Sequence, residues 1–288
     1  MPQHELVDFV NERAGCGLEL IGIAPQGQSG GAAFVRWPDG HQSVVTTAMA
    51  SLDHMRQTAE ILAYAKGLGL PVPHHELLLP RDDGLVAVVQ ERLPGKPIAA
   101  SDASTIDAMV ALNERFAHLL ADRTDVPIPP LCLRESGDPV PRHEPLEQHS
   151  DRSRRLLKRI KELGAADIHE MDGDDLVHVD LTVPNILFDD EGNLSGVVDW
   201  NFGVARGDRR FGLVKLLFDL TWAAGSPGEE QAPRPDALER AAEAVDAIEP
   251  EKLKLYWAHW TLAMLYWTIR SGYEEVIAIH LDLGESRL

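Results

Sequence analysis

A polar loop followed at once by a β-hairpin pattern, within residues 178–199, constrains the fold of this chain more than any other feature. Asn185 opens the first predicted strand, residues 190–193 form the turn, and the return strand ends at Asp199. Because hairpin strands run in opposite directions, Asn185 and Asp199 return to the same end. A carboxamide and a carboxylate at one place suit Mg²⁺, which prefers oxygen ligands. We therefore predict these two residues as metal ligands; the alternative is a turn-forming Asn and a strand-end Asp without a ligand.

The loop before the hairpin has the spacing of a phosphoryl-transfer loop. It reads HVDLTVPN, which fits H-x-D-L-x-x-x-N. Asp180 precedes Asn185 on this loop, so we predict that its carboxylate accepts the proton of an attacking hydroxyl or orients that hydroxyl. The alternative for Asp180 is a structural turn cap. His178 is expected to support the loop through ring hydrogen bonds.

The predicted secondary structure changes from mostly strands to mostly helices near residue 95. The first part has turn signals, a helical pattern over 52–66 and four strand patterns, at 20–23, 33–37, 43–47 and 85–90. The remainder is mostly helical, with a helix capped by Ser104 or Thr105 and further helices over 151–163, 209–222, 235–248 and 251–271, the last with Gly272 as C-cap. We predict an α+β protein with a small strand-rich N-terminal lobe, residues 1–94, and a larger helical C-terminal lobe, residues 95–288.

Composition and charge narrow the class of partner. The 288 residues are 44% hydrophobic and 25% charged, as in globular proteins. No apolar run approaches the ~20 residues of a membrane span, and neither a signal core nor a disulfide framework is evident, so we expect a cytoplasmic protein. The net charge of -19 disfavours nucleic acid and anionic membranes and favours a cationic partner, unless it serves only solubility.

On these motifs the sequence resembles the aminoglycoside phosphotransferase family, antibiotic and small-molecule kinases with a protein-kinase-like fold. The family loop usually reads H-G-D-L-H-x-x-N and its metal segment I-D-W, which HVDLTVPN and VVDW match at the chemical positions. Three more segments resemble family features: the step at 207–208, the Pro-Val-Pro at 71–73 and the hinge at 91–95. Val179 and Thr182 depart from the usual Gly and second His, and Gly212 stands where the family often has Asp.

The resemblance implies a two-lobe kinase fold, ATP or GTP with Mg²⁺, and roles for particular residues. Asp180 would be catalytic, and Asn185 and Asp199 would hold the metal. A glycine loop would cradle the phosphates with its backbone N–H groups, and the hinge backbone would hold adenine. The implied nucleotide-binding residues are Gly27, Ser29, Gly30, Gly31, Arg36, Glu91 and Leu93.

The N-terminal lobe departs from the family at one position. The strand after the turn at 38–40 should carry a Lys or Arg for the phosphates, but Thr46 occupies that position. The helix Glu that pairs with this cation would be Glu60. Either Arg36 or Lys66 substitutes for the missing cation, or the glycine loop and Mg²⁺ hold the phosphates without it.

The function implied is an ATP-dependent O-phosphotransferase that confers resistance to a small cationic antibiotic, an aminoglycoside or a basic cyclic peptide of the viomycin and capreomycin type. Acidic residues of the C-terminal helices, Asp219 among them, would pair with the acceptor's cations. The acidic stretch 227–250 is either a docking rim or a solvated face, and the aromatic residues over 256–267 either core or substrate wall. Alternatives are a kinase for a sugar, choline or amino alcohol, and a silent nucleotide- or antibiotic-binding pseudokinase. We expect a monomer or homodimer.

Overall fold

The computed structural model describes residues 1–24, 31–137, 140–165, 171–225 and 232–288. The chain forms two compact units, which we call unit 1 and unit 2. Unit 1 comprises Met1–Pro97 and Pro184–Val204, and unit 2 comprises Ile98–Val183 and Ala205–Leu288. The hairpin segment predicted at 185–199 is thus part of unit 1, although it lies far along the chain from the rest of that unit.

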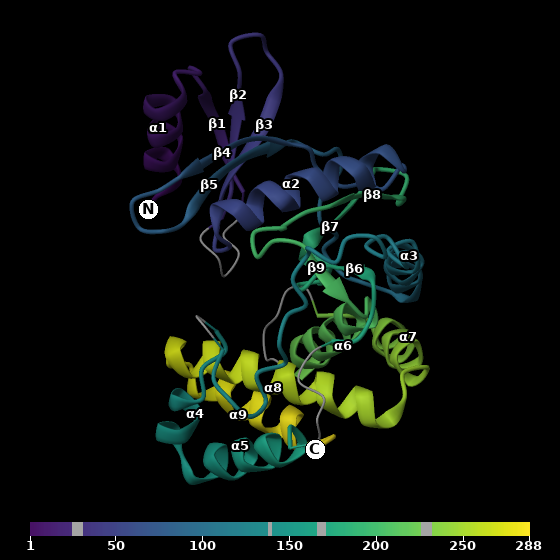
Figure 1. Ribbon diagram of the computed structural model, residues 1–288. Helices are drawn as coiled ribbons and strands as arrows, with labels where there is room; N and C mark the ends of the chain where they lie inside the picture. The colour runs from purple at the N-terminus through teal and green to yellow at the C-terminus, as the bar shows by residue number, and fades with distance from the viewer. Residues whose placement is uncertain (25–30, 138–139, 166–170, 226–231) are drawn as a thin grey trace. The chain divides into compact units, whose positions relative to one another are not determined.

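Unit 1 is built on a five-stranded antiparallel sheet in the order β1-β2-β3-β5-β4 (Figure 1). The strands are β1 (Glu19–Ile23), β2 (Ala33–Arg36), β3 (Gln42–Ala48), β4 (His75–Pro80) and β5 (Val86–Glu91). Two helices accompany the sheet, α1 (Gln3–Ala14) and α2 (Leu52–Gly67). The inner strand β5 is buried along almost its whole length, which explains its continuous apolar sequence.

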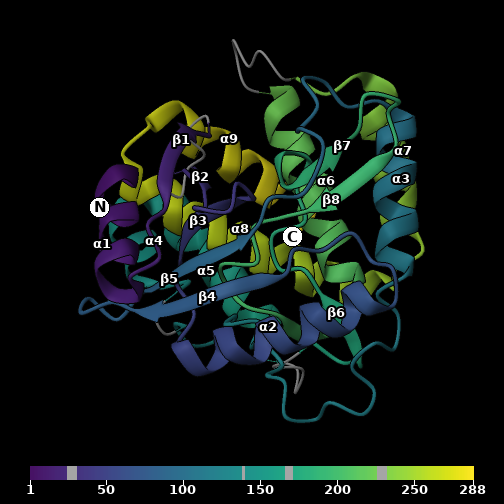
Figure 2. The ribbon, with the colours of Figure 1, turned by 90° about the horizontal axis from the view of Figure 1, so that it is seen from above.

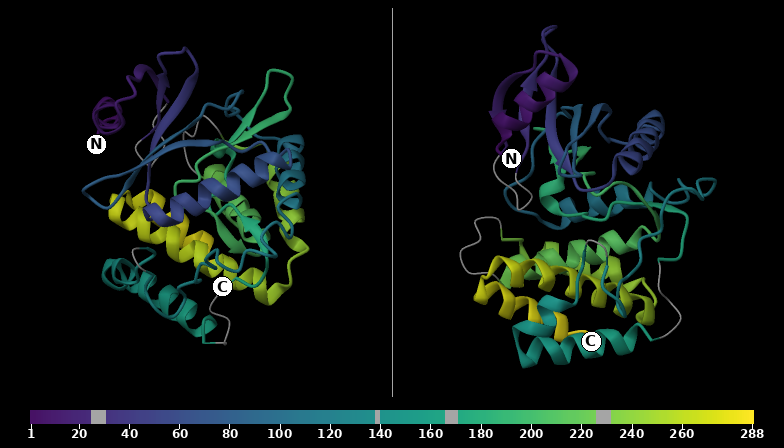
Figure 3. Two further views of the ribbon diagram at one scale, coloured as in Figure 1. Left: turned by 45° about the horizontal axis from the view of Figure 1, so that its top comes forward. Right: turned by 60° about the vertical axis from the view of Figure 1, so that its left-hand side comes forward.

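The two helices cover opposite faces of this sheet, as the right-hand view of Figure 3 shows. Side chains alternate along a strand, so Ala87 and Val89 of β5 pack with the α1 residues Leu6, Val7 and Val10. Val86 and Val88 point the other way and pack with Met55 of α2. The sheet therefore has an apolar layer on each side, and β3 in its middle is held rigidly.

The predicted hairpin is confirmed as β7 (Ile186–Phe188) and β8 (Leu194–Val197). It follows the short 3-10 helix η1 (Val183–Asn185). The chain after β5 reaches this hairpin, where Lys96 and Phe188 exchange two backbone hydrogen bonds of 3.0 and 2.9 Å. Ser195 also donates a hydrogen bond to the Pro94 carbonyl at 2.8 Å, so the hinge segment is fastened to the hairpin.

Unit 2 is mainly helical. Its helices are α3 (Ala103–Glu114), α4 (Glu144–His149), α5 (Asp151–Leu163), α6 (Arg210–Gly225), α7 (Pro235–Asp246), α8 (Pro250–Ser271) and α9 (Glu274–Glu285), and a small ladder pairs β6 (Asp175–Val177) with β9 (Ala205–Gly207). The long α8 packs against α4, α5, α6 and α9, and α3 lies beside α7 (Figure 2).

The α+β class and the two-lobe arrangement of strand-rich and helical parts are confirmed. The helix predicted over 151–163 begins and ends where α5 does, and Gly272 is the C-cap of α8. One detail is wrong: Asp102, not Ser104 or Thr105, caps α3. Four of the five aromatic side chains on α8 are buried, which favours the core role; Trp267 is 36% exposed. Within the described residues, no helix is long and apolar enough to cross a membrane.

Candidate active site

The loop that carries Asp180 lies in unit 2, directly after β6. His178 is 2% exposed, and its ring Nδ1 accepts a hydrogen bond of 3.2 Å from the backbone N–H of Asp180. The expected support of the loop by this ring is thus present. The Asp180 side chain is 30% exposed, so its carboxylate remains accessible while the backbone beneath it is fixed.

A lysine that the sequence analysis did not single out contacts this carboxylate. Nζ of Lys215, on α6, lies 3.4 Å from Oδ1 of Asp180 and 3.2 Å from Oδ1 of Asp219. Burial of the ammonium group works to lower its pKa, but Asp219 and Asp180 outweigh this and raise the pKa of Lys215 above its ordinary value. The lysine is therefore charged at neutral pH, and the carboxylates of Asp180 and Asp219 share one cation.

Asn185 and Asp199 lie at the same end of the β7–β8 hairpin in unit 1. Ile186 pairs with Val197, and the N–H of Val198 donates to the carbonyl of Asn185 at 2.9 Å. Asp199 has φ +64°, in the left-handed region that non-glycine residues rarely occupy. Such backbone persists only where the surroundings impose it. The expected meeting of the two residues at one end of the hairpin is therefore what the backbone shows.

The surroundings that hold Asp199 include a neutral hydrogen-bond chain from β3. The side chain of Asn201 donates to Oδ1 of Asp199 at 2.7 Å and accepts from the hydroxyl of Thr46 at 2.9 Å. The carbonyl of Asn201 also accepts hydrogen bonds from the N–H groups of Met49 and Ala50, at 2.9 and 3.3 Å. Thr46, at the position predicted to lack the family's cation, therefore positions Asp199 through Asn201.

Helix α2 holds the other end of the same segment. The hydroxyl of Thr58 accepts a hydrogen bond from the N–H of Val204 at 3.0 Å, and the ring of His54 bonds the Val204 carbonyl at 2.7 Å. Gly203 has φ +83°, and a Cβ there would lie 2.5 Å from the His54 ring, so only glycine fits. Glu60, expected to pair with the cation, lies on the exposed side of α2.

The residues at this end of the hairpin fit a magnesium ion. The donor set is one carboxylate and one carboxamide oxygen, and both side chains are partly exposed. Mg²⁺ typically takes one or two protein oxygens and completes its octahedron with phosphates and water. Asp199 already has an oriented carboxylate, which lowers the reorganisation that metal binding requires.

The predicted nucleotide-binding residues are distributed over several parts of unit 1. Gly27, Ser29 and Gly30 lie outside the described residues; Gly31 has φ +79°. In the hinge, the N–H of Glu91 donates to the His74 carbonyl at 2.8 Å. That N–H is therefore already paired within unit 1. Leu93 is 7% exposed.

Both candidates for the missing cation have partners elsewhere in unit 1. Arg36 is the last residue of β2, where it forms an exposed 3.2 Å ion pair with Glu19 of β1. Lys66 bonds the Glu91 carboxylate at 2.7 Å and the Val72 carbonyl at 3.3 Å, so it fastens α2 to the hinge. Phosphate binding by Arg36 or Lys66 stays a prediction.

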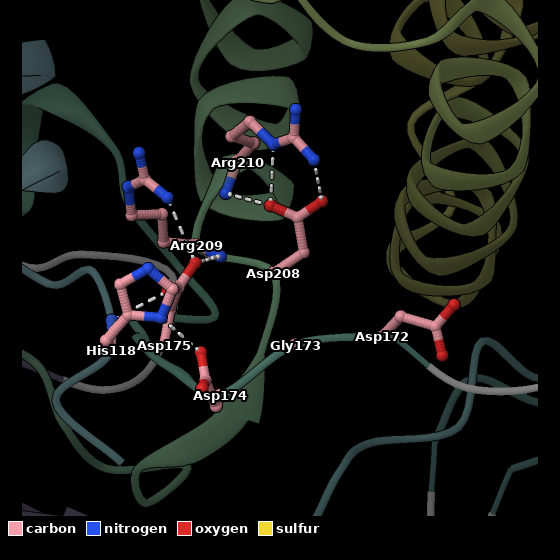
Figure 4. Close-up of a pocket in the computed structure, with 8 residues that line it drawn as sticks. All are labelled: His118, Asp172, Gly173, Asp174, Asp175, Asp208, Arg209 and Arg210. Carbon is pink, nitrogen blue, oxygen red and sulfur yellow. Dashed lines mark hydrogen bonds and ion pairs between the residues drawn. The ribbon is translucent and has the colours of Figure 1, made fainter. Parts of the chain in front are cut away.

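Unit 2 contains a recess lined by charged groups next to the start of α6 (Figure 4). Asp208 accepts hydrogen bonds from the N–H and guanidinium of Arg210 and from the Tyr256 hydroxyl. Burial works to raise its pKa, but Arg210 and Lys252 more than compensate, so the pKa of Asp208 lies below its usual range. The step at 207–208 therefore anchors the N-terminus of α6. The lining residues are His118, Asp172, Gly173, Asp174, Asp175, Asp208, Arg209 and Arg210.

Ligand atoms of His118, Asp174 and Asp175 in this recess lie within 4.8 Å of one another, as in some metal sites. The Asp175 carboxylate, however, accepts a hydrogen bond from the backbone N–H of His118 at 2.8 Å. It also accepts hydrogen bonds from the backbone N–H and the guanidinium group of Arg209, both at 3.1 Å. An arginine that binds a carboxylate neutralises its negative charge, so that carboxylate no longer attracts a metal cation. We interpret this cluster as an ion-pair network that joins β6 to α6.

Sequence reasoning missed Lys215 and Asn201. A signal for Lys215 was available: a lysine stands inside the apolar stretch LVKLLFDL, and a charge within a buried helix needs a partner. Asn201 follows the metal segment directly, but nothing in the sequence indicates that its partner is Thr46, 155 residues earlier.

Comparison with known proteins agrees with this fold. The model of a phosphotransferase enzyme family matches residues 23–256, so the chain belongs to that family. It is a phosphotransferase that acts on hydroxyl groups, as the sequence predicted. No curated protein matches the chain.

Solved structures share the fold across almost the whole chain. One is a thermostable mutant of aminoglycoside phosphotransferase APH(4)-Ia with AMP-PNP and hygromycin B, with a TM-score of 0.70, 17% identity and coverage of 97% of this chain and 96% of that one. An aminoglycoside-3'-phosphotransferase of type VIII has a TM-score of 0.59 and 21% identity over 90% of this chain and 98% of that chain. The GDP and kanamycin complex of APH(2")-IIia has a TM-score of 0.62 and 13% identity, covering 98% of each chain.

Proposed function

We propose that this chain is an ATP-dependent O-phosphotransferase that phosphorylates a hydroxyl group of a small cationic antibiotic, an aminoglycoside or a basic cyclic peptide of the viomycin and capreomycin type, and so confers resistance. The observation that carries the proposal is the oriented pair of Asn185 and Asp199 in a chain that carries Asp180 on the loop just before them. The solved relatives that hold nucleotide and aminoglycoside together support the substrate class.

The residues of unit 1 bind the nucleotide in this proposal. The carbonyl of Glu91 and the backbone of Leu93 hold adenine, and the glycine loop from Gly27 to Gly31 holds phosphate oxygens. Asn185 and Asp199 hold Mg²⁺, whose charge offsets that of the phosphates. The hydrogen bond from Asn201 keeps the Asp199 carboxylate in place as nucleotide enters and leaves.

Asp180 acts on the acceptor. Its carboxylate orients the hydroxyl and accepts the proton while the hydroxyl oxygen bonds to the γ-phosphorus. The bond from that phosphorus to the β–γ bridging oxygen breaks, so the products are the phosphate ester and ADP. Because the His178 ring fixes the backbone of Asp180, the carboxylate needs little rearrangement before transfer.

A cationic acceptor fits the charges of unit 2. Asp180, Lys215 and Asp219 carry a net charge of about -1 by simple ionic count, and the two carboxylates are 30% and 26% exposed, whereas the lysine side chain is 6% exposed. An ammonium group on the acceptor can therefore reach Asp219 without meeting the lysine. The whole-chain charge of -19 favours approach of the same class of molecule.

An ADP-release screen with detection of the phosphate adduct by mass spectrometry tests the function. The panel comprises hygromycin B, kanamycin, viomycin, capreomycin, a macrolide and choline. We expect turnover with an aminoglycoside or a cyclic peptide, and a loss of about 10²–10⁴ in kcat for Asp180→Ala. Asp246→Ala, which removes an exposed carboxylate of α7, is the matched control and keeps parental kcat. Turnover of choline alone would replace the antibiotic by a metabolic acceptor.

A further inference from the structure

Lys215 stands out among the charged residues because it is buried in the middle of a helix. Its side chain is 6% exposed, on an α6 whose neighbouring residues are almost all apolar and buried. A buried ammonium group is strongly unfavourable unless charged partners replace its water. The charge of Lys215 therefore depends on partners within the fold.

The partners of this ammonium group come from two directions. Asp219 lies one turn further along the same helix, at 3.2 Å, and Asp180 lies on the loop after β6, at 3.4 Å. The ring of Trp260 on α8 adds a cation–π contact at 5.6 Å. The lysine is thus enclosed by two carboxylates and an aromatic face.

The close approach of α6 to the Asp180 loop has its own sequence cause. Gly212 lies one turn before Lys215, and a Cβ there would stand 3.1 Å from the His178 carbonyl oxygen and 3.2 Å from Cβ of Leu181. A larger side chain would push the helix away from the loop. Gly212, Lys215 and Asp219 occupy one face of α6 by their spacing. Gly212 therefore lets the loop come near enough for Lys215 to reach Asp180.

We propose that Lys215 is a positioning residue for the transfer reaction. Its ammonium group contacts the Asp180 carboxylate and holds it in place, while Asp219 also pairs with the lysine. The inference rests on the proposed function of Asp180. Because the lysine is buried and the carboxylate is not, Lys215 acts through Asp180 rather than on the acceptor. The raised pKa of Lys215 keeps that cation charged across the neutral range.

The first test measures kcat and the KM for ATP of Lys215→Met and of the parent. This substitution keeps the approximate length of the side chain and removes its charge. We use the fastest acceptor of the panel above. We expect kcat to fall about tenfold or more, a part of the ~10²–10⁴ that general-base positioning supplies, with the KM for ATP within about twofold. Lys252→Met, which removes the 3.5 Å pair with Asp208 in the same unit, is the matched control and keeps parental kcat.

A double-mutant cycle separates positioning from packing. If Lys215 acts through Asp180, then Lys215→Met changes the residual kcat of Asp180→Ala less than about twofold. If its effect is instead the same in both backgrounds, Lys215 has a general structural role and the proposal is wrong.

Lys215→Met alone leaves Asp219 without its cation and can unfold unit 2, so a second variant removes both charges. Lys215→Met with Asp219→Asn is compared with Asp219→Asn alone at saturating acceptor. A kcat at least about tenfold lower in the double variant supports the proposal; equal kcat shows that Lys215 only neutralises Asp219 and overturns it. Parental kcat in Asp180→Ala, or no turnover of any acceptor by the parent, overturns the proposed function itself.

Discussion

Thr46 shows how one side chain on β3 changes the way the metal segment is held. A lysine there would bring a positive charge toward the phosphates, whereas the threonine hydroxyl donates to Asn201, which in turn donates to Asp199. Thr46 is 7% exposed, so its hydroxyl has little access to water and depends on this partner. The hydrogen-bond chain orders the carboxylate but supplies no charge, so phosphate neutralisation falls more heavily on the metal.

We expect Thr46→Val, which keeps the shape and removes the hydroxyl, to raise the Mg²⁺ concentration for half-maximal ADP release roughly 2- to 10-fold. The reason is the loss of one hydrogen bond, worth about 0.5–1.5 kcal/mol. Thr47→Val is the matched control, since Thr47 lies next along β3 and its hydroxyl bonds Arg81 instead. Equal Mg²⁺ requirements in the two variants would contradict the role of Thr46.

Individual site residues could be predicted where their chemistry is local in the chain. Asp180, Asn185 and Asp199 lie within one loop and one hairpin, so spacing alone placed the last two together. The partners of Lys215 and Asn201 could not be found in this way, because tertiary packing brings them together from distant segments. The same holds for the ion pair of Arg36 with Glu19 of β1, which the pairing of two strands creates.

Among the elements, the boundaries were predicted best where a helix has one apolar and one charged face. Helix α5 has such a pattern and was predicted to the residue. Helices α1, α4 and α9 were not predicted, and β4 was missed because HELLLP lacks the alternation of a half-buried strand. Asp102 was missed as the cap of α3, although its carboxylate accepts from the N–H of Thr105 at 3.1 Å.

The cap of α3 gives a pH-dependent prediction. Hydrogen bonds from Ser104 and Thr105 and the charge of Arg234 lower the pKa of Asp102 to about 2. A carboxyl group with a lowered folded-state pKa stabilises the protein above its unfolded pKa of about 3.9 and loses that contribution as pH falls toward 2. We expect Asp102→Ala to lower the free energy of unfolding at pH 7 by about 0.5–2 kcal/mol.

Asp102→Asn is the matched variant, because asparagine caps helices about as well as aspartate but does not titrate. Denaturant unfolding followed by circular dichroism between pH 2 and 7 measures all three proteins. The asparagine variant should remain close to the parent at pH 7 and lose less stability below pH 4. If Asp102→Asn loses as much unfolding free energy below pH 4 as the parent does, then Asp102 is not the group responsible for that loss.

The stability of the whole molecule should also depend on buried histidines. Burial lowers the pKa of His259 to about 4, although its ring bonds the Leu131 carbonyl at 2.8 Å. Between about pH 4 and pH 6.5, the His259 ring binds a proton in the unfolded chain but not in the folded one. The free energy of unfolding therefore falls as pH falls through this window, by at most about 1.4 kcal/mol per pH unit for one such group. His259→Gln should reduce that slope when denaturant unfolding is measured between pH 4 and 7, and a slope equal to the parent's would contradict the role of His259.

The charge of the whole chain bears on how the acceptor arrives. Asp and Glu outnumber Lys and Arg by 46 to 27, and the acidic residues of α7 are all exposed. A field of this sign concentrates cations near the surface and repels the nucleotide, and salt weakens both effects. The screening length is about 10 Å at 0.1 M salt and about 3 Å at 1 M. The two substrates of the proposed reaction should therefore respond to salt in opposite directions.

We expect the KM for a polycationic acceptor such as viomycin or kanamycin to rise roughly tenfold between about 0.05 and 0.5 M KCl, because screening removes long-range attraction over most of the surface. The KM for ATP should stay constant or fall over the same range, since screening also removes its repulsion. Steady-state ADP release at several KCl concentrations, with Mg²⁺ saturating throughout, gives both constants from one protein. If the two KM values rise together, salt acts on the fold or on the metal, and the acidity of the chain serves solubility rather than acceptor capture.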